Sequence, residues 1–78
     1  MRYGVNTHFS RERVIEKAIE YFEDLGLEIT QRDDTSVCFE GGGGHVTLST
    51  FEGDQTDVDI LTEEWDAKVK EFIQRIGE

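Results

Sequence analysis

Cysteine and histidine are the side chains best suited to metal binding or nucleophilic catalysis, and this sequence contains only Cys38, His8 and His45. These are too few for a structural zinc site unless carboxylates or a second subunit contribute, and their spacing matches no metal-binding motif. A thiol next to an imidazole base can act as a nucleophile, so Cys38 with His45 is the candidate pair for such chemistry. The simpler interpretation is a quiet, partly covered thiol, because most unpaired cysteines behave as small apolar side chains.

Four consecutive glycines, Gly41–Gly44, separate two segments with strand patterns. A phosphate-binding loop would lead into a helix and carry a Lys or Ser/Thr at a fixed offset, which this run does not do. Glycines supply the positive φ angles of tight turns, so we expect a hairpin; a loop that gates a ligand is the alternative. The hairpin pairs Glu40 with His45, as a surface ion pair, and Cys38 with Thr47. Cys38, Glu40 and His45 are therefore the candidate ligand-binding residues.

An acidic stretch near the C-terminal end of the sequence raises the question of calcium, which prefers oxygen ligands. The acidic residues are Asp54, Asp57, Asp59 and Glu63. A calcium loop of the EF-hand type needs acidic residues at every second position and then a glycine, whereas Asp57 and Asp59 flank Val58 in a strand pattern. We expect neither a metal nor a cofactor.

Alternation with a period of two predicts five strands. The first spans Arg2–Phe9 and directs every second residue, Tyr3 through Phe9, to one side. The other four are marked by inward-facing residues: Leu27 and Ile29; Val37 and Phe39; Val46, Leu48 and Thr50; Val58 and Ile60. Turn residues occupy Asp33–Thr35 and Gly53–Gln55. The second of these turns pairs Phe51 with Asp57 and Ser49 with Asp59.

Two amphipathic helices follow the first and the last strand. Ser10 is expected to cap the first helix, and Gly26 to end it. Thr62 is expected to cap the second helix, which Gly77 closes. Apolar residues at helical spacing form one stripe in each helix: Val14, Ile15, Ala18, Ile19, Phe22 and Leu25, then Trp65, Val69, Phe72, Ile73 and Ile76.

The element order β-α-β-β-β-β-α predicts a single α+β domain over residues 1–78, with an antiparallel sheet and both helices on one face. This order resembles the TBP-like or helix-grip fold from about Arg2 to Ile76, without any family sequence motif. The resemblance implies that the first and second strands lie at opposite sheet edges, and that larger members correspond to two such units joined edge to edge. If Arg2–Phe9 were irregular, the fold would reduce to an α-β4-α sandwich.

The charge of the chain limits its partners. The formal net charge is -10. Residues 1–32 hold five basic and six acidic side chains, and residues 33–78 hold three basic and twelve acidic ones. Nucleic acids and anionic membranes are bound through clustered Lys and Arg, so we expect neither as a partner. A single cysteine and the lack of an apolar leader or long apolar run favour a soluble, cytoplasmic protein.

Two functions remain. The first is a non-catalytic module that binds a protein, with a second copy of the chain as the expected partner. Its homodimer interface is the first strand, with Tyr3, Val5, Thr7 and Phe9, because an unpaired strand edge without Lys or Pro is a template for pairing. The second strand, with Glu28 and Arg32, is better protected. The alternative function is a ligand carrier or small enzyme that uses the outer sheet face near Cys38, Glu40 and His45.

Overall fold

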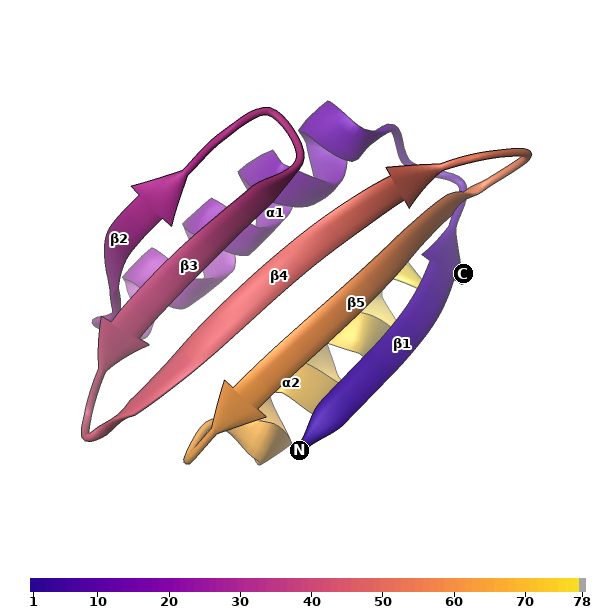
Figure 1. Ribbon diagram of the computed structural model, residues 1–78. Coiled ribbons are helices and arrows are strands. Elements are labelled where there is room, and N and C mark those ends of the chain that lie inside the picture. Colours follow the sequence, from indigo (N-terminus) through magenta and orange to yellow (C-terminus); the bar gives the residue numbers. More distant parts are fainter. Residues whose placement is uncertain (78) are drawn as a thin grey trace.

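Figure 1 shows the computed structural model, which describes residues 1–77. The predicted order of elements is confirmed. The strands and helices are β1 (Arg2–Thr7), α1 (Arg11–Asp24), β2 (Glu28–Arg32), β3 (Ser36–Gly41), β4 (Gly44–Glu52), β5 (Thr56–Glu63) and α2 (Asp66–Ile76).

The five strands form one antiparallel sheet in the order β1-β5-β4-β3-β2, so the first two strands of the sequence are its edges, as expected. Both helices lie behind the same face (Figure 1): α1 packs on β2, β3 and β4, and α2 packs on β5 and β1. No described helix covers the opposite face of the sheet. Neither helix is long and apolar enough to cross a membrane.

The core lies between the sheet and the two helices, and Phe22 of α1 is at its centre. Its ring centroid is 5.2 Å from that of Phe39 in β3 and 5.5 Å from that of Phe72 in α2. All three rings are fully buried. Burial of an aromatic side chain of this size contributes about 2–3 kcal/mol, so the triplet joins the two layers strongly.

Hydrogen bonds of short polar side chains begin α1 and form the β2–β3 turn, as the sequence predicts. The Ser10 hydroxyl accepts a hydrogen bond from the Arg13 amide at 3.3 Å, which caps α1. The Asp33 carboxylate accepts bonds from the backbone amides of Thr35 and Ser36, both at 2.9 Å, and from their hydroxyls. These bonds, the Thr35 amide first, hold the pKa of Asp33 below its ordinary value. Gly26, with a φ of 97°, follows the end of α1.

Both predicted hairpin registers are confirmed. Glu40 pairs with His45 and Phe51 pairs with Asp57. The loop contains fewer residues than the four-glycine run, because Gly41 belongs to β3 and Gly44 belongs to β4. Only Gly42 and Gly43 form the turn, with φ angles of 58° and 82°. Two successive positive φ angles are typical of the tight hairpin turns that match strand twist.

Two predicted boundaries are wrong. The first strand ends at Thr7, not Phe9, because the Thr7 hydroxyl accepts a hydrogen bond from the Phe9 amide and turns the chain. The second helix starts at Asp66, so Thr62 is not its cap. Thr62 is instead a buried residue of β5 whose hydroxyl donates to the His45 carbonyl at 2.8 Å. Trp65 precedes the helix, and its side chain makes no cap hydrogen bond.

Candidate functional site

The structure brings together two of the three candidate ligand-binding residues. Glu40 and His45 are directly opposed on the outer face of the β3–β4 hairpin. Cys38 opposes Thr47 in the next pair on the same face of the hairpin, and it is half-buried. Diagonal neighbours of this kind have Cα atoms roughly 7–8 Å apart, and no hydrogen bond joins the described Cys38 and His45 side chains. The register therefore does not assemble Cys38 and His45 as a nucleophile and its base.

The imidazole of His45 lies nearer to Glu63, which the sequence suggested only as a member of the acidic stretch and not as a partner of His45. The predicted ion pair of His45 with Glu40 is wrong, because the His45 Nε2 atom instead lies 3.9 Å from Oε1 of Glu63 in β5. β4 lies between β3 and β5. The direction of the His45 side chain therefore determines which of these strands supplies its partner. An open hollow of about 520 Å³ lies beside this pair and is lined by Glu28, Glu40, Gly41, Gly43, Gly44 and His45.

This hollow has little chemistry to offer a ligand. Cys38 does not line it. Among residues 1–77, no three Cys, His, Asp or Glu side chains are grouped so that they could hold a metal ion. One imidazole beside carboxylates on an exposed sheet face forms at most a weak ion pair, worth about 1 kcal/mol or less.

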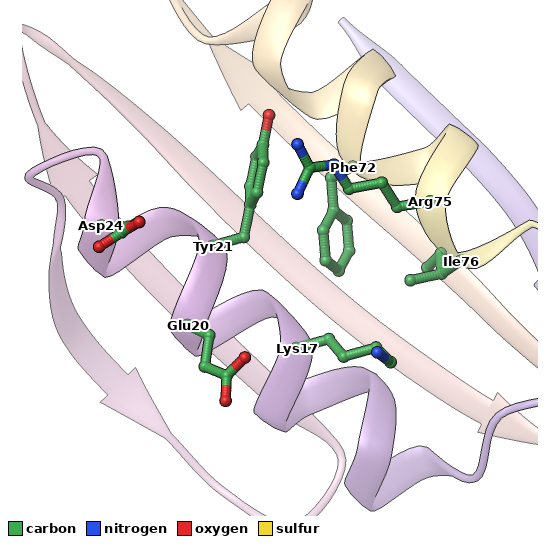
Figure 2. Close-up of a pocket in the computed structure, with 7 residues that line it drawn as sticks. All are labelled: Lys17, Glu20, Tyr21, Asp24, Phe72, Arg75 and Ile76. Carbon is green, nitrogen blue, oxygen red and sulfur yellow. The ribbon is translucent and has the colours of Figure 1, made fainter.

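The second hollow is the seam between the two helices. Figure 2 shows Tyr21 of α1 and Phe72 and Arg75 of α2 directed into this space, which measures about 220 Å³. The Tyr21 hydroxyl donates to Glu71 at 3.3 Å, and the Arg75 guanidinium lies 5.0 Å from the centroid of the Tyr21 ring. Burial, and then the Glu71 carboxylate, raise the pKa of Tyr21. The volume is below the roughly 300 Å³ of typical small-molecule sites, and Tyr21 bridges it, so it is a packing seam.

The outer sheet face carries two exposed apolar residues, Phe51 and Leu61, with exposed fractions of 58% and 49%. Phe51 is opposite Asp57, and Leu61 is opposite Thr47. The two pairs are four residues apart along β4, which corresponds to roughly 13 Å. They are isolated side chains and do not form one apolar patch.

The free edge of β1 is the remaining candidate. Thr62 of β5 and Met1 exchange backbone hydrogen bonds, with the Thr62 amide 2.9 Å from the Met1 carbonyl oxygen. Hydrogen-bonded and non-hydrogen-bonded pairs alternate along an antiparallel ladder. Since Met1 forms a hydrogen-bonded pair, Tyr3, Val5 and Thr7 also direct their backbone N–H and C=O groups toward β5. Arg2, Gly4 and Asn6 direct theirs away from the sheet, and all three are exposed.

The side chains predicted for the interface lie mainly behind this edge. Thr7 is buried, and Phe9 lies beyond the end of β1. The Tyr3 hydroxyl donates a 2.8 Å hydrogen bond to Asp66 in the first turn of α2, which raises the pKa of Tyr3. Tyr3 and Val5 are half-buried against the core. Sequence reasoning missed Arg2, Gly4 and Asn6 as the residues with outward backbone groups, although ladder alternation from a known neighbour would have identified them.

Side chains leave the β1 edge open. Arg2 turns toward β5, where its Nη2 atom lies 2.9 Å from the Asp59 carboxylate and Nε makes a second bond at 3.0 Å. Gly4 has no side chain, and a Cβ built there would meet only the Val58 carbonyl oxygen at 3.9 Å. The register from Arg2 to Thr7 is continuous, without a bulge. β1 therefore lacks the devices that normally block edge pairing.

The opposite edge is protected. β2 has a register shift between Ile29 and Gln31, so Thr30 is the extra residue of a bulge. Bulges twist an edge strand and interrupt its hydrogen-bonding pattern. Acidic side chains lie at both ends of β2, at Glu28 and in the Asp33 turn. Of the two described edge strands, β1 alone combines a continuous register with a sequence that contains no Asp or Glu.

Comparison with known proteins identifies no family for this chain, since no protein-family model and no curated protein matches it.

Proposed function

We propose that this protein is a non-catalytic binding module that takes up an extended protein segment as a sixth strand beside β1. The observation that carries the proposal is the row of exposed, outward-directed backbone groups at Arg2, Gly4 and Asn6. An extended segment that pairs with them satisfies six amide and carbonyl groups at once. Each backbone hydrogen bond contributes about 0.5–1.5 kcal/mol, so six of them contribute roughly 3–9 kcal/mol toward offsetting the cost of association.

Selectivity in strand addition comes from sites for alternate side chains. Behind the β1 edge, an open hollow of about 410 Å³ is lined by Val5, Ile73, Gln74 and Gly77. The inward-facing side chains of an added strand would enter this hollow. Its apolar members, Val5 and Ile73, are both half-buried, so an apolar side chain there would complete their cover.

The alternative of a carrier or small enzyme has less support. Glu40 and His45 form one wall of an open hollow, but Cys38 is outside it. Without Cys38, the hollow lacks the thiol nucleophile that this alternative assigned to it. The β1 edge, in contrast, offers several outward backbone groups that have no hydrogen-bond partner among residues 1–77.

Selection from a displayed random-peptide library on the immobilised protein tests the proposal. We expect peptides that bind the parent and Gly4→Ala alike but bind Gly4→Pro at least about tenfold more weakly, because proline removes the outward amide and its ring obstructs pairing. Gly4→Ala keeps the amide and has room for its methyl group. Asn6→Pro supplies a second blocked edge should Gly4→Pro fail to fold. No selected peptide, or peptides that bind every variant equally, would refute strand addition at β1.

A further inference from the structure

We propose that the strand accepted by the β1 edge is β1 of a second copy, in antiparallel pairing, with the two-fold axis at Gly4. This inference rests on the proposed function and names its partner. A two-fold contact between identical edges is self-complementary, so one exposed strand supplies both halves of the interface. The resulting sheet would contain ten strands, with the two β1 strands at its centre.

The backbone selects the register. Only Arg2, Gly4 and Asn6 of β1 carry outward groups, so the pairs across the axis must join these residues. With the axis at Gly4, Gly4 faces the partner's Gly4 and Arg2 faces the partner's Asn6, which uses every outward group on both strands. An axis at Tyr3 or Val5 leaves one of the three residues in each copy unpaired within the strand.

The outer face at this register is free of collisions. The two Gly4 residues meet without side chains. Arg2 is held over β5 by Asp59, away from the partner strand. The first acidic residue of the chain is Glu12, so β1 brings no carboxylate to the axis, in a chain of net charge -10. β1 is therefore the edge at which like-charge repulsion opposes self-pairing least.

On the helix-covered face of the proposed dimer, the distance between the two α2 helices is compatible with helix packing. α2 packs on both β5 and β1 (Figure 1). A helix centred over the space between two neighbouring strands is about half a strand spacing from each. The axis lies half a spacing outside β1, so the two α2 helices would be separated by about two strand spacings, roughly 10 Å. This separation is within the usual range for packed helices. The hollow lined by Val5, Ile73, Gln74 and Gly77 would then be covered by the partner's Tyr3 and α2.

Disulfide trapping tests the register. In a Cys38→Ser background, Gly4→Cys places the two new thiols on a hydrogen-bonded pair, whose Cα atoms are about 5.5 Å apart and within disulfide range. We expect most of the Gly4→Cys protein to form a covalent dimer under mild oxidation. Asn6→Cys is the matched control, because its two thiols would be roughly 14 Å apart and should not join. An equal mixture of Arg2→Cys and Asn6→Cys chains should give the mixed dimer.

Light scattering of the parent protein separates the failure of this inference from that of the proposed function. A dimer that joins through Asn6→Cys but not Gly4→Cys would overturn the register. A parent that stays monomeric up to millimolar concentration, while library peptides still bind the β1 edge, would overturn the second copy as partner and leave strand addition intact. If neither dimer nor peptide pairs with the edge, both proposals fail.

Discussion

The indole Nε1 of Trp65 donates a 2.8 Å hydrogen bond to the carbonyl of Gly41, which fixes the β3–β4 turn to the residue that precedes α2. The ring also lies against the turn itself, since a Cβ atom built on Gly42 would be only 2.8 Å from Trp65 Cζ2. The glycine turn and the start of the second helix are therefore one packed unit. Their closeness explains why Trp65 is half-buried although it lies outside the helix.

Alanine at the two turn glycines should have unequal effects. Both residues have positive φ, which costs an alanine roughly 1–2 kcal/mol. Gly43 faces open space, whereas a methyl group on Gly42 collides with the indole ring. We expect Gly43→Ala to lower the free energy of unfolding by about 1 kcal/mol and Gly42→Ala by about 2–4 kcal/mol. Urea denaturation measures both, and equal losses would show that Trp65 does not pack on the turn.

Local signals account for the parts of the fold that the sequence predicts well. Ser10 caps α1 because its hydroxyl acts within one turn of chain, and the β4–β5 register follows from a short loop and the alternation of Val58 and Ile60. For Thr62, the local sequence does not decide between a strand and a helix cap. Thr is favourable both in strands and as a helix cap, so the assignment of Thr62 to β5 depends on contacts with distant residues. Its backbone pairs with Met1 and Val46, and its hydroxyl donates to the His45 carbonyl.

The candidate site was harder to predict than the fold. Pairing of Glu40 with His45 follows from the hairpin, but the contact of His45 with Glu63 depends on which neighbouring strand the ring turns toward. Which backbone groups of β1 point outward depends on which of its residues hydrogen-bond to β5, and the paired residues of the two strands are 49 to 59 positions apart in the chain. Neither feature has a local sequence pattern.

Asp33 should contribute to acid sensitivity. Its folded pKa is lowered by hydrogen bonds from Thr35 and Ser36, so its contribution to stability is present above the unfolded value near 4 and is lost as pH falls through the folded value. We expect Asp33→Ala to lower the melting temperature at pH 6 and to have little effect near pH 2. Asp34→Ala is the matched control, with little effect at either pH. A difference between parent and Asp33→Ala that persists unchanged at pH 2 would contradict this assignment.

Tyr3 should contribute to stability at neutral pH and lose this contribution at alkaline pH. Its hydrogen bond to the Asp66 carboxylate raises its folded pKa, so its contribution is complete below the unfolded value near 10 and is lost as pH rises through the folded value. We expect Tyr3→Phe to melt at a lower temperature than the parent at pH 8, with the gap closing above pH 10. Asp66→Asn should lower the phenol pKa in a spectroscopic titration. A phenol pKa unaffected by Asp66→Asn would rule out the bond in solution.

Salt should stabilise this protein. A net charge of -10 on 78 residues implies self-repulsion, and salt screens exposed charges over about 8 Å at physiological ionic strength. We expect the melting temperature to rise by several degrees between about 10 and 150 mM NaCl. A fall would mean that exposed ion pairs, such as Arg2 with Asp59 and Arg11 with Glu52, outweigh the repulsion.

Hydrogen exchange of the β1 amides, followed by NMR from micromolar to millimolar protein, tests the pairing of β1 edges most directly. Tyr3, Val5 and Thr7 donate toward β5, so we expect their amides to exchange slowly at every concentration. The outward amides of Gly4 and Asn6 should exchange rapidly in dilute protein and become protected as concentration rises. Gly4→Pro should abolish the protection of Asn6. Rapid exchange of both outward amides throughout the concentration range would contradict pairing of the two β1 strands.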